Sequence, residues 1–546
     1  MESKIASRVH ESIFQIAVLG GVCILGGLGG FVQADEIAGE RFEPPALAAL
    51  DASVEWVEQP VLNGRELLKQ YWQKQPAIEV TIEDALELRN DGERANRQIL
   101  DALGRPPTNA DEVDWNATIR RHASRDVNSF NPLIIRSRTD FDVHLLLGVS
   151  LFGFDWNLRP FASQDAVKSW HSSADRLHDK VILRDDLTWS DGQSVTAHDV
   201  VFSFQTIMNP NVPVPAMRSG TDQIRWVEAY DDHTLVFFHR EALATNVWNL
   251  NFPVIPKHVY ENTVEDDPTL SNSNAHLALE RAPITAGPYT LTKHIPNQEI
   301  VLTRRESWYL HQGKQVRPKP YFQTVRIRIV GDPAAALTEL KAGDLDEMTL
   351  NSEQWNRQTN GDDFYRRNTK VTATEWTTFS IFWNLKSPFF EDRKVRTAMA
   401  YAFDHEKMLV ETLQGLYQPA IGPFHRTSWM VPKKLPTPYR QDLEKAARLL
   451  DEAGWKDSDG DGIRDKQIAG RLVPFEFELI CPPIQERLTV CRLLKQSLRK
   501  PAIPVTLENV LEIGFREEAV RKQRAGRLRG WVGKMGSVVG ERLPED

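Results

Sequence analysis

The sequence predicts a mixed α/β fold that is divided among two or three folding units. From residue 129 onward, short apolar strands alternate with amphipathic helices and turns, and this alternation favours an α/β architecture. The chain has 546 residues, which is too long for one ordinary hydrophobic core. The clearest strand-turn-helix unit covers residues 180–207.

That unit begins with a short apolar strand at residues 180–184. Asp191-Gly192 predicts a tight turn, because glycine tolerates the positive φ that such a turn requires. Thr196 and Asp199 have the spacing of a capping box at a helix start. The apolar residues that follow fall on one helical face, which is typical of a half-buried helix: Val200, Val201, Phe204 and Ile207.

The N-terminal segment has the pattern of a secretory signal. Lys4 and Arg8 precede an apolar run over residues 13–32, and Val32-Gln33-Ala34 fits the small-residue cleavage rule. We expect residues 1–34 to be a signal peptide cleaved after Ala34, so that the mature protein is periplasmic or secreted. The alternative is an uncleaved membrane anchor, because the run is long enough to span a bilayer.

Composition and cysteine content limit the partners and the cysteine chemistry that the sequence allows. The chain is 41% hydrophobic and 26% charged with a net charge of −9, which is ordinary for a soluble globular protein and argues against a nucleic-acid partner. After export, Cys481 and Cys491 are the remaining cysteines. In an oxidising compartment they form either a disulfide or two buried thiols, and the sequence leaves both open.

Residues 35–115 are predicted to form a helical N-terminal extension. Helices are expected over 65–75 and 82–103, and Gly104-Arg105-Pro106-Pro107 ends the second one. The sequence assigns no chemistry to this extension.

The later elements continue the α/β pattern. Asp332 and Pro333 predict a helix start and Gly343 its end, while residues 143–152 suit either a helix or an extended run. Other helices are predicted over 393–402, 406–413, 443–453 and 486–499, and strands over 235–238, 299–304, 321–330, 377–384, 471–481 and 505–510.

Several sequence blocks, in this order, are specific enough to indicate a family: Trp189-Ser190-Asp191-Gly192, Asp199 to Phe204, Ala286-Gly287-Pro288-Tyr289, Asp332 to Ala336, Trp383-Asn384 and Ala453-Gly454-Trp455. With these blocks the chain resembles the extracellular solute-binding proteins of family 5, the peptide- and nickel-binding receptors of ABC importers. The resemblance covers residues 125 to 510.

The resemblance implies a two-lobed periplasmic binding protein of class II, of the three-domain peptide-binding type, with mixed sheets and a hinge. Such a receptor encloses a peptide between its lobes and delivers it to an ABC permease and its ATPase in the inner membrane. It is not an enzyme and needs no cofactor. The implied domains are lobe I at 116–150 and 271–372, domain II at 151–270 and domain III at 373–510.

The chain departs from the family after Val510. In the family, an aspartate near the end of the third domain pairs with the amino end of the peptide. Residues 511–546 form instead a basic tail with no aromatic-Asp-Pro segment. We expect a truncated or frameshifted end and an incomplete domain III, and a divergent natural terminus is the alternative.

The family layout predicts five ligand-binding residues: Phe130, Asn131, Trp383, Asn384 and Arg396. The two aromatic residues and the arginine have structural alternatives. The aromatic side chains suit a hydrophobic core, and the arginine suits a salt bridge on a helix face.

A possible calcium site lies in the run from Asp457 to Asp465. Asp457, Asp459, Asp461 and Asp465 alternate around a glycine, as in the first nine places of a calcium loop. Ile468 takes the twelfth place, where a glutamate is expected. The alternative is an Asp-Gly turn that binds no metal.

Other functions remain as alternatives. Within the binding class, the solute is nickel, haem or another small molecule such as an oligosaccharide. From a different class, a secreted hydrolase would use paired carboxylates around Asp457. The sequence contains no HExxH, GxSxG or Walker lysine motif to support an enzyme.

Overall fold

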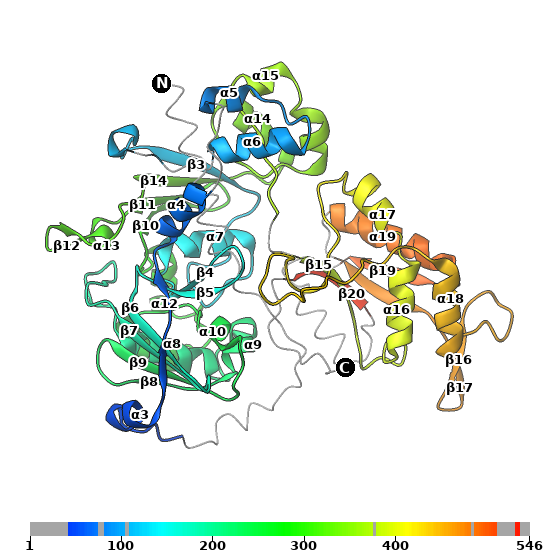
Figure 1. Cartoon of the computed structure of the whole chain (residues 1–546), viewed down its shortest axis with the longest axis horizontal. Coiled ribbons are helices and arrows are strands. Elements are labelled where there is room, and N and C mark those ends of the chain that lie inside the picture. The colour runs from blue at the N-terminus through cyan, green and yellow to red at the C-terminus, as the bar shows by residue number, and fades with distance from the viewer. Residues whose placement is uncertain are drawn as a thin grey trace. The chain divides into compact units, whose positions relative to one another are not determined.

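The computed structural model describes residues 42–74, 81–103, 107, 109–374, 378–481, 485–509 and 530–535 (Figure 1). These residues form two compact units. Unit 1 contains the described residues up to 374 together with Thr427–Trp429, and unit 2 contains the remainder. Within the described residues, no helix is long and apolar enough to cross a membrane. The predicted signal peptide lies outside them.

A five-stranded antiparallel sheet organises one half of unit 1. Its strand order is β1-β6-β7-β9-β8, with β1 (Trp56–Glu58), β6 (Val167–Ser173), β7 (His178–Leu183), β9 (Thr234–His239) and β8 (Ile224–Ala229). The strand-turn-helix unit predicted at residues 180–207 is confirmed: Gly192 has φ +91°, and Thr196 and Asp199 close a capping box at the start of α8 (Ala197–Met208). Val200, Phe204 and Ile207 are buried on that helix.

A second, four-stranded sheet forms the other half of unit 1. Its order is β10-β11-β14-β3, with β10 (Tyr289–Ile295), β11 (Glu299–Arg304), β14 (Thr324–Ile329) and β3 (Thr118–Ala123). The helix α7 (Arg138–Leu147) contributes Val143 and Leu147 to the core of this sheet. The sequence suited either a helix or an extended run at residues 143–152. In the structure the helix ends at Leu147.

The N-terminal extension is not only helical, as the sequence predicts. In addition to α3 (Leu47–Ser53), α4 (Gly64–Lys74), α5 (Ile82–Glu87) and α6 (Glu93–Leu103), it contains β1 and β2 (Val61–Leu62). β1 pairs with β6, and β2 pairs with β5 (Pro160–Ser163). Strands of two or three residues are too short to show a periodic pattern, so their place depends on a partner strand far along the chain.

The predicted helix over 82–103 is two helices. Leu88 caps α5 in an extended conformation, and Gly92 has φ +130° just before α6. In α6, Ile99 and Leu103 pack with Val371, and Asn96 hydrogen-bonds with Thr372. The extension is therefore an integral part of unit 1.

Gly287 marks a close approach of two backbone segments in unit 1. Its N–H donates to the carbonyl oxygen of Leu147 at 2.8 Å. A Cβ at Gly287 would lie 2.5 Å from the carbonyl oxygen of Gly148 and 2.7 Å from that of Leu146. Backbone atoms cannot move aside as a flexible side chain can, so this position requires glycine.

We expect Gly287→Ala to lower the free energy of unfolding by about 2–3 kcal/mol, because overpacking against backbone forces a local shift. The control is Gly64→Ala, where an added Cβ meets nothing within 4 Å. Urea unfolding of both variants tests this. Equal stability of the two variants would contradict the close-approach argument.

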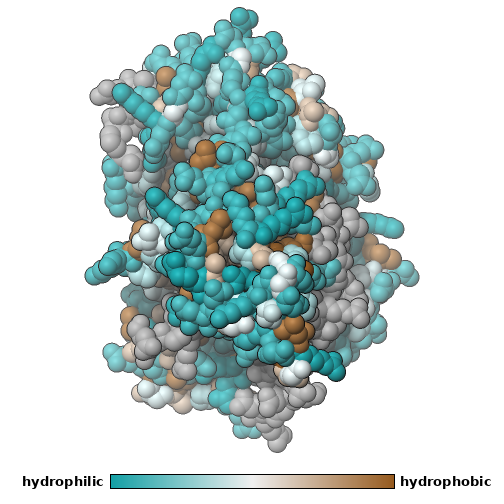
Figure 2. Space-filling view, turned by 90° about the vertical axis from the view of Figure 1, so that its right-hand side faces the viewer, coloured by the Kyte–Doolittle hydropathy of each residue, from teal (hydrophilic) through white to brown (hydrophobic). Residues whose placement is uncertain are grey.

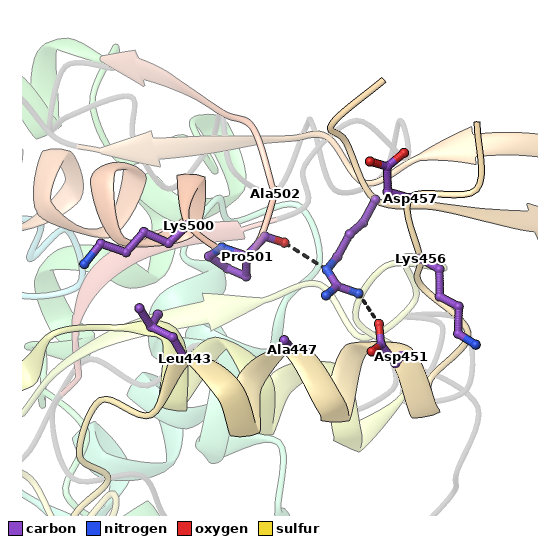
Figure 3. Close-up of a pocket in the computed structure, with 9 residues that line it drawn as sticks. Leu443, Ala447, Asp451, Lys456, Asp457, Lys500, Pro501 and Ala502 are labelled. Atoms are coloured by element: carbon purple, nitrogen blue, oxygen red, sulfur yellow. Dashed lines mark hydrogen bonds and ion pairs between the residues drawn. The ribbon is translucent and has the colours of Figure 1, made fainter. Parts of the chain in front are cut away.

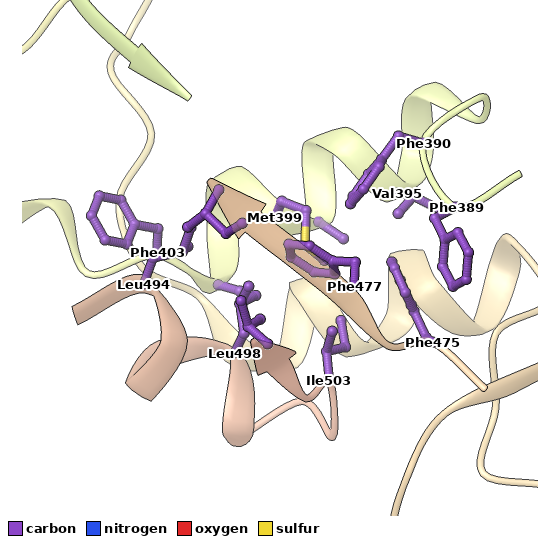
Figure 4. Close-up of a cluster of buried hydrophobic side chains, with 14 of the residues drawn as sticks. Phe389, Phe390, Val395, Met399, Phe403, Phe475, Phe477, Leu494, Leu498 and Ile503 are labelled. Carbon is purple, nitrogen blue, oxygen red and sulfur yellow. The ribbon is translucent and has the colours of Figure 1, made fainter. Parts of the chain in front are cut away.

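Unit 2 is built on a mixed sheet with the order β15-β20-β18-β19. Helices pack with it around one hydrophobic core (Figure 4). The elements are β15 (Thr378–Trp383), β20 (Gly530–Met535), β18 (Phe477–Cys481), β19 (Val505–Asn509), α16 (Arg393–Ala402), α18 (Leu443–Glu452) and α19 (Gln485–Arg499). Between α16 and α18, the short helix α17 (His405–Lys407) continues into a π-helical turn at Met408–Thr412.

Aromatic side chains fill the middle of this core. Phe389 stacks on Trp455 at 5.3 Å between ring centroids, and Phe475 lies 4.6 Å from Trp455. Figure 4 shows Phe475 and Phe477 between the helix that carries Val395 and the segment that carries Ile503. Asp392 and Asp442 cap α16 and α18, as the sequence predicts.

One strand prediction for unit 2 is wrong, and one strand lies where the sequence predicted none. The single strand expected over 471–481 is divided at Pro474 into β17 (Arg471–Pro474), which pairs with β16 (Asp465–Ile468), and β18. The predicted basic tail contains β20, which pairs with both β15 and β18. A strand between two neighbours is held by backbone hydrogen bonds on both sides, so side-chain pattern alone does not predict it.

Candidate functional site

Exposed hydrophobic side chains are concentrated in unit 2. Figure 2 shows one face of the molecule on which hydrophilic residues predominate and hydrophobic ones occur in small separate groups. Among the described residues, six of the nine large hydrophobic side chains with strong exposure belong to unit 2: Phe379, Leu385, Val410, Leu435, Tyr439 and Leu472. Singly exposed hydrophobic residues are ordinary on a protein surface, but one of them, Phe379, has aromatic and charged neighbours.

Phe379 belongs to a cluster in which aromatic and charged groups meet. Its ring is 41% exposed, lies 6.0 Å from the Tyr417 ring in an edge-on arrangement, and has the Arg487 guanidinium 5.3 Å from its centroid. The Tyr417 hydroxyl donates to the carboxylate of Glu486 at 3.0 Å. We call Phe379, Tyr417, Glu486 and Arg487 the Phe379 cluster.

The fold explains how these residues meet. Phe379 lies on β15, the outermost strand of the described sheet on its side. Glu486 and Arg487 lie in the first turn of α19, whose N-terminus follows the end of β18 in the same sheet. The cluster therefore combines an apolar ring, one carboxylate and one guanidinium at an edge of the sheet. Sequence reasoning missed it, because its members are far apart along the chain.

The two candidate ligand residues in unit 1 have structural contacts. Phe130 is buried in the core of the second sheet, and its backbone N–H donates to Glu280 at 2.7 Å. The side-chain oxygen of Asn131 accepts from the N–H of Leu133 at 3.0 Å and so closes a turn. Their proposed contact with a ligand stays a prediction.

The three candidate ligand residues in unit 2 also have local partners. Trp383 stacks on Phe390 at 4.4 Å. The side-chain oxygen of Asn384 accepts from the N–H of Lys386 at 3.1 Å. The Arg396 guanidinium donates to the carbonyl oxygens of Phe390 and Glu391 at 2.7 and 2.8 Å, which replaces the helix-face salt bridge considered from sequence. Trp383 and Asn384 lie at the end of the strand that carries Phe379.

The structure brings together three of the four predicted calcium ligands. One carboxylate oxygen from each of Asp457, Asp459 and Asp465 lies within 4.8 Å of the others, and Asp461 is not in this group. The Asp457 carboxylate accepts from the N–H groups of Gly460 and Gly462. Asp465 is 5% exposed, and its hydrogen bonds from Ser458 lower the pKa of the carboxyl group. The loop thus has the hydrogen bonds of an Asp-Gly turn as well as a group of carboxylates.

A pocket of about 430 Å³ lies beside this loop (Figure 3). Its walls come from α18, the loop that carries Lys456 and Asp457, and the turn at Lys500-Pro501-Ala502. Arg464 crosses it, donating to the carbonyl oxygen of Pro501 at 2.9 Å and to the Asp451 carboxylate at 2.5 Å. These bonds hold the three walls together, which gives Arg464 a structural role.

Comparison with known proteins identifies the family. The family model described as bacterial extracellular solute-binding proteins, family 5 Middle, matches residues 163–538. The chain belongs to this family. The match continues past residue 510, where the sequence reading ends the resemblance, and it includes β20. The family match thus extends past the last motif block of the sequence, and the domain boundaries of this family 5 protein stay predictions.

Two curated relatives are each 28% identical to this family 5 protein over the residues that align. The oligopeptide-binding protein AppA of Bacillus subtilis is 28% identical over 296 residues, which are 52% of this chain and 50% of the relative. Protein XP55 of Streptomyces lividans is 28% identical over 282 residues, 52% of this chain and 47% of the relative. The chain spans about half the length of the curated relatives it matches.

Solved structures confirm the fold. AppA of Bacillus subtilis in complex with a nonapeptide aligns with a TM-score of 0.61 at 24% identity, covering 77% of this chain and 79% of that one. NikZ of Campylobacter jejuni with Ni(L-His) gives 0.58 at 24% identity, covering 77% of each chain. DppA of Helicobacter pylori with the peptide STSA gives 0.59 at 18% identity, covering 77% and 78%. The mixed α/β binding-protein fold predicted from sequence is thus confirmed.

Proposed function

We propose that this chain is the substrate-binding receptor of an ABC importer and that its ligands are peptides. The family supports the receptor role. The residues of the Phe379 cluster are the observation that favours peptides over other solutes as ligands. On this proposal the protein works outside the inner membrane, delivers its ligand to a permease with its ATPase, and catalyses no covalent step.

The chemistry of the Phe379 cluster suits a peptide. A peptide carries an ammonium at one end, a carboxylate at the other and apolar side chains between them. Glu486 is a partner for an ammonium, Arg487 is a bidentate partner for a carboxylate, and the Phe379 ring covers apolar groups. β15 at the edge of the sheet offers backbone groups of the kind that an extended peptide joins. Relatives support this choice, since AppA and DppA were solved with peptides.

Native mass spectrometry of the full chain, purified without added ligand, tests the proposal. We expect co-purified short peptides. An empty protein, or one that carries only a metal or haem, would overturn the peptide assignment. Nickel is the main alternative, because the structurally similar NikZ holds Ni(L-His).

Calorimetric titration with a co-purified peptide tests the Phe379 cluster itself. We expect Phe379→Ser to weaken binding about 10-fold or more, because aromatic contacts contribute strongly to interface affinity. The control is Leu472→Ser, a residue that is also 41% exposed but lies on β17, away from the cluster. Equal losses in both variants would remove Phe379 from the site.

We also propose a weak calcium site at Asp457, Asp459 and Asp465. Three carboxylates without the twelfth-place glutamate suit dissociation constants of about 0.1–1 mM. At 10 mM Ca²⁺ the free energy of unfolding of unit 2 is then expected to rise by about 1–3 kcal/mol. Thermal unfolding with and without Ca²⁺ measures this. Asp459→Asn is expected to abolish the rise and Asp461→Asn to preserve it. Absence of a shift in the unmodified chain would exclude the site.

A further inference from the structure

Two cysteine side chains meet inside the core of unit 2. Cys481 is the last residue of β18, and Cys491 lies in α19. Both side chains are 0% exposed, and their sulfur atoms are 2.7 Å apart. The structure records a hydrogen bond and no disulfide between them. Neighbouring strand and helix therefore hold the two thiols in contact without any rearrangement of the core.

The two thiols differ in their readiness to react. The hydrogen bond from Cys491 lowers the pKa of the Cys481 thiol, and the charges of Arg487 and Arg492 act in the same direction. The contact with Cys481, together with burial, raises the pKa of the Cys491 thiol. The thiolate is the reactive form in disulfide chemistry. Cys481 is thus the thiol of the pair with the greater thiolate character in the folded protein.

We propose that Cys481 and Cys491 form a disulfide in the exported protein. The two thiols lose two protons and two electrons as the S–S bond forms. A dithiol-disulfide oxidant of the oxidising compartment accepts the electrons, and its own disulfide becomes two thiols. Because both sulfurs are buried, the bond forms while the chain folds or when α19 opens, and the finished core then protects it from reductants.

The bond would link the last residue of β18 to the first half of α19. It closes a loop from residue 481 to residue 491, and this loop contains Glu486 and Arg487 of the Phe379 cluster. Cross-linking a loop of this length restricts the unfolded chain and changes the unfolding equilibrium constant by on the order of 100-fold. The bond thus stabilises the start of α19, and this effect holds whichever solute the protein binds.

Alkylation under denaturing conditions tests the assignment. The full chain carrying Cys23→Ser, which removes the third cysteine, is exported, purified without reductant and treated with iodoacetamide. We expect no alkylation, and a cross-linked peptide pair that contains Cys481 and Cys491. Full alkylation of both cysteines would overturn the proposal.

Thermal unfolding with and without reductant separates the bond from the packing of the side chains. We expect reductant to lower the unfolding midpoint of unit 2 in the Cys23→Ser chain. The control adds Cys481→Ala and Cys491→Ala to that chain, and reductant should leave its midpoint unchanged. Hydrogen exchange of residues 485–490 should accelerate on reduction only when both cysteines are present. A midpoint that is insensitive to reductant in both proteins would contradict a stabilising bond.

Discussion

Replacing Asp179 by alanine is expected to lower the free energy of unfolding by about 3–5 kcal/mol. The substitution removes a buried carboxylate and leaves its hydrogen-bond donors without an acceptor. The Asp179 carboxylate is 4% exposed and lies on β7 in the five-stranded sheet. It accepts from the indole N–H of Trp170 at 2.7 Å, from the hydroxyl of Ser172, and from the Nε2 side of His239 at 2.7 Å. Three adjacent strands are therefore joined through one carboxylate.

The size of this effect comes from unsatisfied groups and not from lost contact area. Without the carboxylate, the buried donors of Trp170 and His239 and the half-buried hydroxyl of Ser172 would lose their acceptor, and each buried group left unsatisfied costs about 1–3 kcal/mol. Asp179→Asn keeps the shape and one acceptor oxygen, so a smaller loss is expected.

Chemical denaturation followed by tryptophan fluorescence measures the loss. Asp185→Ala, at an exposed aspartate nearby in the chain, is the control and should change stability by less than about 0.5 kcal/mol. If Asp179→Ala behaved like Asp185→Ala, the buried network would have no energetic role.

The stability of unit 1 is expected to fall by up to about 3 kcal/mol as pH drops from 6.5 to 4, owing to His144 alone. His144 is 7% exposed on α7. Its Nε2–H donates to the carbonyl oxygen of Ser129 at 3.1 Å, because a carbonyl oxygen can only accept. Burial lowers the pKa of His144 to about 4, although the hydrogen bond to Ser129 and the charge of Asp140 oppose this.

The sign follows from proton uptake. Between pH 6.5 and 4 the unfolded chain binds a proton at His144 and the folded chain does not, so falling pH favours unfolding. The stabilisation is complete above pH 6.5 and is lost as pH approaches 4. Burial also lowers the pKa of His178, which lies in unit 1 as well, so this histidine adds to the slope.

Substitution isolates the contribution of His144. His144→Gln keeps a donor for the Ser129 carbonyl but does not titrate, and we expect it to reduce the slope of unfolding free energy against pH in this range. His198→Gln, at an exposed histidine on α8, serves as the control. An unchanged slope in His144→Gln would show that His144 is not the titrating group.

Local patterns allowed many elements to be predicted from the sequence. Capping residues predicted α8, α14 (Pro333–Ala342), α16 and α18, because a cap and the apolar face behind it involve residues only three or four apart. Asp332 accepts from the N–H of Ala335, and Gly343 ends α14 with φ +86°. The ordered motif blocks also indicated the family that the comparisons established.

Other features depend on partners that are distant in the sequence. β1, β2 and β20 exist as strands because their backbones pair with β6, β5, β15 and β18. Neither composition nor periodicity in segments of two to six residues specifies such pairing. Pro474 has no N–H to donate to a ladder, and β17 ends there before β18 begins at Phe477.

The candidate site, too, has features that local sequence patterns predict and features that depend on distant parts of the chain. The sequence by itself determined the family, the α/β class and the residue types available for binding, since these follow from composition, spacing and short-range order. Only the tertiary structure decided that Arg396 holds backbone carbonyls, that Asp461 stands apart from the other aspartates, and that Phe379 meets Tyr417, Glu486 and Arg487. Residues so far apart in the chain become neighbours only when the sheet and α19 pack together, and hydrophobic burial across the whole core of unit 2 drives that packing.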